Sequence, residues 1–96
     1  MVYDVSKVSG IGEFTKKTEK ERELFFVNEK AFLVLNKNTV EVRCDEKLGK
    51  FLREKYESVM ESRYFGRGGI EIVLSGQMTN DELYDLVRLS YNMTIA

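Results

Sequence analysis

The sequence lacks histidine, proline and tryptophan, and its only cysteine is Cys44. Without histidine, the chain lacks the side chain that most often transfers protons near neutral pH and most often binds metals. A single thiol excludes an internal disulfide. Its neighbours Asp45 and Glu46 oppose thiolate formation, so we expect a buried, unreactive cysteine. These absences argue against an enzyme, and we expect no cofactor and no metal site.

Long apolar runs and an excess of either charge are also missing. No segment approaches the roughly 20 apolar residues of a membrane-spanning helix, and the first residues lack the pattern of a secretory signal. We therefore expect a cytoplasmic protein without a membrane partner. The 15 basic and 16 acidic residues give a formal net charge of -1, whereas strong nucleic-acid binders are usually basic. Nucleic-acid binding would therefore depend on a local basic patch.

The composition fits one folded domain over residues 1–96, with 43% hydrophobic and 32% charged residues. β-Branched and aromatic segments, separated by breaks that contain asparagine, predict an antiparallel meander. Asn28 and Glu29 are expected to form a two-residue turn within it. Strands are predicted at 24–27, 30–35, 39–43 and, after a helix, 70–74.

Side chains alternate cleanly in the third of these strands. Val40 and Val42 are expected on one face of the sheet. Thr39, Glu41 and Arg43 are expected on the other face. The strand therefore has one apolar side and one polar side.

Two amphipathic helices accompany the strands. Asp45 is the expected N-cap of a helix over 46–57, and a long irregular connection is expected to follow it over 58–69. Thr79 and Glu82 have the spacing of a capping box that begins the closing helix. Grouped strands followed by helices predict an α+β fold, in which an antiparallel sheet of about four strands carries both helices on one face.

The first part of the chain is less regular. Residues 1–15 predict a short or poorly ordered N-terminal segment, in which apolar residues at helical spacing are compatible with one short helix. These residues are Val2, Val5, Val8 and Ile11. The charged run over 16–23 is compatible with either a solvated strand or a mobile loop.

The most unusual chemistry lies just before the fourth predicted strand. Arg63 and Arg67 supply forked donors that suit phosphate or carboxylate groups. Tyr64 and Phe65 add faces on which a base can stack. The simpler interpretation is a flexible turn that leads into a strand, and both interpretations remain open at this point.

Glycines and hairpin lysines extend this candidate site. Gly66, Gly68 and Gly69 reduce steric bulk and permit positive φ, so that a phosphate or a backbone can approach closely. Lys30 and Lys37 lie at hairpin ends, where they are expected to extend a basic rim. Lysines at such positions also protect strand edges against aggregation.

Several segments match the pattern of a known family. They are the strand-to-helix segment 42–48, the helix end 53–59, the strand 70–74, the acidic helix start 81–83 and the pair Ser90-Tyr91. On these positions the chain resembles the MmcQ/YjbR family.

The resemblance covers about residues 24–93 and has implications for fold and function. It implies an α+β fold similar to secretion-chaperone and CyaY-like folds. Family members are described as DNA-binding proteins with a double-wing surface. Arg67 matches a family lysine and Arg63 matches a basic family position.

Two functions follow as expectations. The first is a nucleic-acid-binding module that binds DNA weakly through the basic segment and the hairpin lysines. The alternative is a protein-interaction or homodimerisation module without catalytic activity, because edge strands can accept a partner strand.

Overall fold

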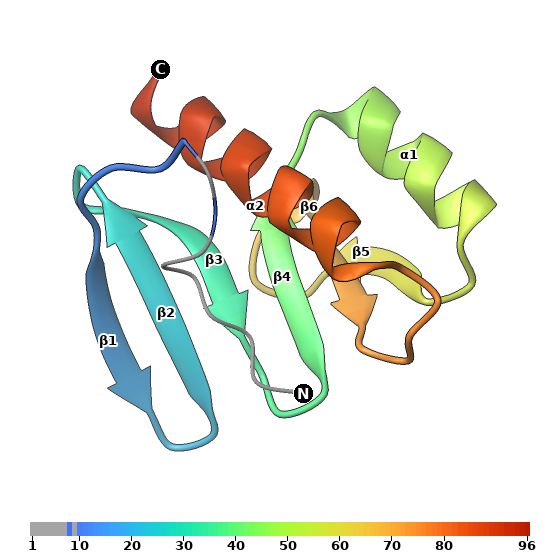
Figure 1. Cartoon of the computed structure of the whole chain (residues 1–96), viewed down its shortest axis with the longest axis horizontal. Coiled ribbons are helices and arrows are strands. Elements are labelled where there is room, and N and C mark those ends of the chain that lie inside the picture. The colour runs from blue at the N-terminus through green and yellow to red at the C-terminus, as the bar shows by residue number, and fades with distance from the viewer. Residues whose placement is uncertain (1–7, 9) are drawn as a thin grey trace.

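The computed structural model describes residues 8 and 10–96 (Figure 1). This part of the chain forms one antiparallel sheet of six strands in the order β1-β2-β3-β4-β6-β5, with two helices. The strands are β1 (Thr15–Glu19), β2 (Arg22–Val27), β3 (Lys30–Leu35), β4 (Thr39–Arg43), β5 (Val59–Ser62) and β6 (Gly66–Val73). The helices are α1 (Glu46–Lys55) and α2 (Asn80–Ile95). The α+β fold predicted from the sequence is confirmed.

The two helices share one face of the sheet (Figure 1). Helix α2 packs on β2, β3 and β4, whereas α1 packs on β5 and β6. Between them and the sheet lies a single apolar core, which includes Val40, Val42, Ile70, Ile72 and Val87. Burial of such side chains is the main stabilising contribution to a domain of this size.

Glu41 and Glu71 lie on the sheet face away from the helices, which we call the open face. They are direct partners across β4 and β6, and they alternate with the apolar pairs Val40–Ile72 and Val42–Ile70. The predicted division of the third strand into an apolar and a polar side is therefore confirmed.

A two-residue turn joins β2 to β3, as predicted. Asn28 and Glu29 both have positive φ, at 51° and 67°. Two successive left-handed residues match the twist of the flanking strands. Tight closure of this hairpin sets the register of the first two pairs, Val27–Lys30 and Phe26–Ala31.

A β-bulge in β3 adds an aromatic ring to the core. Phe25 pairs with Leu33 and Phe26 pairs with Ala31, so Phe32 is an extra residue between the two pairs. A bulge interrupts the strict alternation of side chains. Phe32 is fully buried, and its ring lies edge-on to Tyr91 of α2 with the centroids 5.1 Å apart.

The sheet has two more strands than the sequence predicted. The charged run over 16–23, which is compatible with either a strand or a loop, contributes most of β1 and the beginning of β2, and the five residues of β1 pair along β2. The predicted irregular connection over 58–69 is wrong, because it contains β5 and the beginning of β6. β5 is a short edge strand that exposes Met60 and Glu61, so it shows no apolar alternation. Three glycines at the beginning of β6 weaken the strand signal there.

The ends of the other elements agree closely with expectation. Helix α1 ends at Lys55, because Tyr56 is already extended at φ -121° and ψ 126°. Its predicted range of 46–57 was two residues too long. Asp45 caps α1, and the side chains and backbones of Thr79 and Glu82 form the predicted capping box of α2.

The predicted N-terminal helix falls largely outside the described residues, because Val2 and Val5 are not among them. Of the same stripe, Val8 is buried in the core and Ile11 packs against it. Neither helix in the described part of the chain is long and apolar enough to span a bilayer.

Candidate functional site

Two buried glutamates organise the open face. Glu41 and Glu71 are only 2% and 0% exposed, and they face each other across neighbouring strands. Adjacent buried carboxylates are strongly unfavourable unless hydrogen bonds and positive charge compensate them. The residues that compensate this pair form the candidate site.

Arg63 compensates Glu71. Its Nε donates to Glu71 Oε1 at 2.9 Å and its Nη2 donates to Oε2 at 2.6 Å. The Thr39 hydroxyl donates a third hydrogen bond to Oε2 at 2.8 Å. Burial raises the pKa of Glu71, but the hydrogen bonds from Arg63 and Thr39 and the Arg63 charge outweigh it, so the pKa lies below its usual value. The hydrogen bonds to Glu71 and then the negative charge of Glu71 raise the pKa of Arg63.

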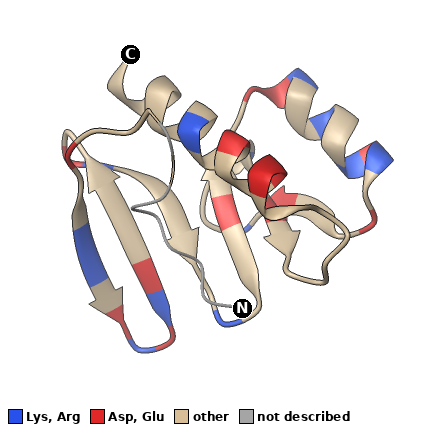
Figure 2. Cartoon of the chain, viewed as in Figure 1, with Lys and Arg blue, Asp and Glu red and all other residues tan. Residues whose placement is uncertain are grey.

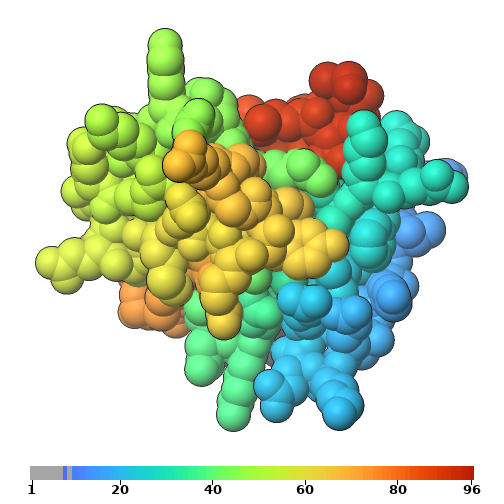
Figure 3. Space-filling view, turned by 180° about the vertical axis from the view of Figure 1, so that it is seen from behind, coloured from blue at the N-terminus to red at the C-terminus, as the bar shows by residue number. Residues whose placement is uncertain are grey.

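Neutral donors compensate Glu41. Its Oε1 accepts hydrogen bonds from the Ser62 hydroxyl at 2.7 Å and from the Tyr64 backbone amide at 2.9 Å. Its Oε2 accepts a hydrogen bond from Asn36 Nδ2 at 2.8 Å. These contacts draw the β5–β6 connector, residues 63–65, across the open face. Figure 3 shows this face, with the connector (yellow to gold) reaching towards the β1–β2 side.

The aromatic residues of the connector lie in a row with two arginines. The rings of Tyr64 and Phe65 meet edge to face, with their centroids 5.0 Å apart. Arg22 lies over Tyr64, with its Cζ 5.5 Å from the ring centroid, and Arg43 lies over Phe65 at 4.9 Å. Such cation–π contacts hold the guanidinium groups against the sheet. The end of this row at Tyr64 remains partly accessible to solvent, because this residue is 40% exposed.

A groove of about 740 Å³ runs beside the connector, and we call it the basic groove. It lies between the β1–β2 and β3–β4 hairpin tips and Arg63. Its lining combines four cationic residues, two acidic residues and three neutral residues: Lys20, Arg22, Lys37, Arg63, Glu19, Glu21, Asn36, Asn38 and Thr39. The Glu19 carboxylate accepts a hydrogen bond from Arg22 Nε at 2.7 Å. Cationic groups therefore outnumber acidic groups in this groove.

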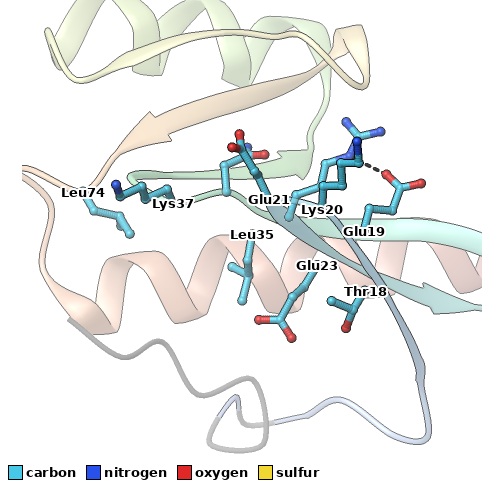
Figure 4. A pocket seen from close by; sticks show the side chains of 10 residues that line it. Thr18, Glu19, Lys20, Glu21, Glu23, Leu35, Lys37 and Leu74 are labelled. Carbon is cyan, nitrogen blue, oxygen red and sulfur yellow. Dashed lines mark hydrogen bonds and ion pairs between the residues drawn. The ribbon is translucent and has the colours of Figure 1, made fainter.

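Two smaller hollows adjoin the same hairpin tips. A polar cleft of about 400 Å³ is lined by Arg22, Asn36, Glu41, Arg63 and Tyr64, and we call it the arginine cleft. Another hollow, of about 460 Å³, is drawn in Figure 4, where residues of the β1–β2 tip and Lys37 of the β3–β4 tip surround it. The basic groove and the arginine cleft have three lining residues in common, so one ligand can reach both.

The comparison with known families decides the identity of this fold. The family model described as YjbR matches residues 12–93. The chain belongs to the YjbR family. This confirms the resemblance that the sequence motifs indicated.

A solved structure has the same YjbR fold. The crystal structure of the Deinococcus radiodurans protein DR2400, described as a DUF419 domain, superposes with a TM-score of 0.77 and 16% sequence identity. The match covers 92% of this chain and 72% of that chain. At this identity the likeness concerns the fold. No curated protein matches the sequence.

The structure of this YjbR protein brings only some of the predicted site residues together. Arg63 and Lys37 line the basic groove, and Tyr64 lines the arginine cleft beside it. Lys30 and Arg67 are exposed but lie outside the residues that line either hollow. Lys30 begins β3, whereas Lys37 follows its end, so the two lysines belong to opposite ends of one strand.

Other residues of the site were not predicted from the sequence. Arg22 lies over Tyr64, while Lys20 lines the groove that Arg63 borders. Both had been interpreted as part of a solvated charged run. The alternation that placed Glu41 and Arg43 on one face could have indicated the polar open face, but nothing local paired Glu41 with Glu71.

Gly66, Gly68 and Gly69, which were expected to loosen the segment before the strand, lie within β6 and differ from one another in conformation and contacts. Gly66 has a positive φ of 63°, whereas Gly68 and Gly69 do not. A Cβ on Gly69 would lie 2.6 Å from both the Val42 carbonyl oxygen and Phe65 Cβ. Gly69 is therefore required by the close packing of β6 on β4 and the connector.

Charge is mixed over the rest of this YjbR protein (Figure 2). Acidic residues cluster in the first half of α2, including Asp81, Glu82 and Asp85, whereas basic residues are spread along α1. Cys44 is buried, as predicted. Burial and Asp45 raise the pKa of this thiol, and Arg53 opposes them.

Proposed function

We propose that this YjbR protein binds nucleic acid weakly through phosphate contacts in the basic groove. The observation that supports this most is the convergence of four cationic side chains from three separate segments. These are Lys20, Arg22, Lys37 and Arg63. Contacts between such groups and phosphates provide the sequence-independent part of nucleic-acid affinity.

Tyr64 supports a preference for unpaired bases. Tyr64 lines the arginine cleft beside the basic groove, and the residue is 40% exposed. Stacking of bases on aromatic rings is a common feature of single-strand binding proteins. We therefore expect a single strand to bind more tightly than a duplex of the same length.

A salt titration of paired lysine variants tests the proposal. Fluorescence anisotropy would measure the binding of labelled single-stranded and duplex oligonucleotides at low salt. Lys37→Ala removes a cation from the groove, whereas Lys50→Ala removes an exposed cation from α1. We expect Lys37→Ala to weaken binding and to reduce the slope of log K against log salt by about one. Lys50→Ala keeps the wild-type slope.

Two outcomes contradict nucleic-acid binding at the groove. One is an anisotropy signal that does not change with any oligonucleotide at low salt. The other is an equal loss of affinity in both lysine variants, because binding would then follow net charge and not the groove. Circular dichroism spectra of both variants must match that of the wild type for either comparison to count.

A protein-interaction module is the second candidate, and the sheet edges support it. β1 and β5 are the first and last strands of the described sheet, so each pairs on one side only. Such edges accept a partner strand. Light scattering that gives the monomer mass at every protein concentration would argue against homodimerisation.

A further inference from the structure

Arg63 has hydrogen-bonding capacity that its partner does not use. A guanidinium carries five N–H donors. The contact with Glu71 uses Nε and one hydrogen of Nη2. The remaining donors belong to the other edge of the guanidinium. The Arg63 side chain is 73% exposed, so a ligand can reach this edge.

Glu71 holds the Nε and Nη2 edge of the Arg63 guanidinium in place from within the sheet. Its side chain is fully buried in β6, and Thr39 of β4 donates a further hydrogen bond to it. A long arginine side chain on a connector ordinarily loses much rotational freedom when it binds a ligand. Here part of that cost falls on folding, because a two-point contact with a buried carboxylate orients the guanidinium plane before a ligand binds.

A second arginine faces the same cleft in a similar way. Arg22 lines the arginine cleft together with Arg63. Its Nε is held by Glu19, at 2.7 Å, and its guanidinium lies over Tyr64. Two guanidinium groups, each bonded through Nε to a glutamate, thus border one small polar space. Glu41 also lines this space, and its carboxylate oxygens already accept hydrogen bonds from Ser62, the Tyr64 amide and Asn36. Forked donors of this kind match the oxygen geometry of a phosphate group.

From this geometry we infer that the arginine cleft binds one phosphate of the strand, and that Glu71 is the positioning residue that holds Arg63 for it. The inference rests on the proposed function and adds to it a specific phosphate site. It also gives Glu71 an effect on binding that is opposite to the effect of its charge. A carboxylate repels phosphate, so its removal strengthens binding unless it orients Arg63.

The test compares two substitutions that change the net charge equally. Glu71→Gln removes the buried carboxylate, and Glu61→Gln removes an exposed carboxylate of β5. The measurement is the Kd for a labelled single-stranded oligonucleotide at low salt. We expect Glu71→Gln to weaken binding by about three- to tenfold, as for the loss of a well-oriented charged hydrogen bond. Glu61→Gln leaves binding unchanged or slightly tighter.

Arg63→Lys tests the orientation of the guanidinium if Glu71→Gln does not fold. This variant keeps the positive charge but cannot form the forked contact. We expect it to weaken binding to a similar extent, with a circular dichroism spectrum like that of the wild type.

Each contrary result has a distinct meaning. Tighter binding by Glu71→Gln, equal to that of Glu61→Gln, would overturn the positioning role and leave the basic groove in place. Wild-type affinity in Arg63→Lys would do the same. Failure of the wild-type protein to bind any oligonucleotide would overturn the proposed function and this inference together.

Discussion

Gly69 lies where β6 packs tightly against both β4 and the aromatic connector. A methyl group at this position would meet the Val42 carbonyl oxygen and Phe65 Cβ at 2.6 Å. Contacts this short require the backbone to move. At Gly68, by contrast, the nearest atom would be the Phe65 carbonyl oxygen at 3.7 Å, an ordinary contact.

We therefore predict different effects of alanine at these two neighbouring positions. Gly69→Ala lowers the free energy of unfolding by about 1–3 kcal/mol, the usual range for overpacking. Gly68→Ala changes it by less than about 0.5 kcal/mol. Urea denaturation followed by circular dichroism measures both, and similar losses in the two variants would contradict this account.

At the level of single residues, the sequence predicted the candidate site residues better than it predicted their contacts. The basic, aromatic and glycine residues before the fourth strand were recognised as unusual, and Arg63 lies at the centre of the candidate site. Their partners were not recognised, because Glu41 and Arg22 come from other strands. Glu71 lies in the fourth predicted strand itself, eight residues from Arg63, but nothing in the sequence indicated this contact. A residue's own sequence neighbours carry little information about cross-strand contacts of this kind.

At the scale of elements, Ser90 attaches α2 to the sheet at a gap in strand pairing. Regular pairing of β3 with β4 is present from Leu35–Val40 to Leu33–Val42. The next pair in this register would be Phe32 with Arg43. The Ser90 hydroxyl accepts a hydrogen bond from the Arg43 amide at 2.8 Å and donates one to the Phe32 carbonyl at 2.6 Å. One side chain of α2 thus bridges two backbone groups where the bulge lies.

Removal of this one hydroxyl is predicted to lower the free energy of unfolding substantially. Ser90→Ala leaves the part-buried Arg43 amide and the buried Phe32 carbonyl without this partner, and we expect a loss of about 2–4 kcal/mol in unfolding free energy. Ser75→Ala, at an exposed position, is the matched control and is expected to have little effect. Equal urea midpoints for the two variants would show that Ser90 does not stabilise this junction.

Prediction from the sequence was most accurate for elements with local signals. Both helix caps were found, because Asp45 and Thr79 bond to amides two or three residues away. The β2–β3 turn was found for a similar reason. β5 was missed, because an edge strand of four residues needs its neighbour β6 to be recognisable.

At the scale of the whole molecule, buried and capped carboxylates couple folding to pH. The pKa of Glu71 is lowered below its ordinary value of 4.5 in the folded state, despite the opposing effect of burial. The Thr79 backbone and then the Tyr56 hydroxyl, as hydrogen-bond donors, lower the pKa of Glu82. A carboxyl with a lowered pKa binds protons more weakly in the folded state than in the unfolded state. Its stabilising contribution is therefore present above pH 4.5 and is lost as the pH falls through the lowered pKa.

We predict that the urea midpoint stays nearly constant from about pH 7 to about pH 5.5 and falls at lower pH. The Glu71→Gln variant has a lower midpoint at neutral pH and a shallower decline in acid, because one of the coupled carboxyls is gone. Parallel acid declines in the variant and the wild type would contradict a role for Glu71 in this coupling.

The sequence by itself determined the class of fold, the helix caps, the meander and its turn, and the two sides of β4. These features depend on periodicity and on contacts between residues close in the chain, so the residues alone specify them. It also indicated the YjbR family.

Only the tertiary structure decided which charges meet. Pairing of β4 with β6 places Glu41 beside Glu71, across a sequence gap that contains a helix and a strand. Two buried carboxylates then require donors, and the connector with Arg63 supplies several of them. The position of Arg63 at the border of the basic groove follows from that requirement, because electrostatic compensation acts between groups that are close in space, whatever their separation in the chain.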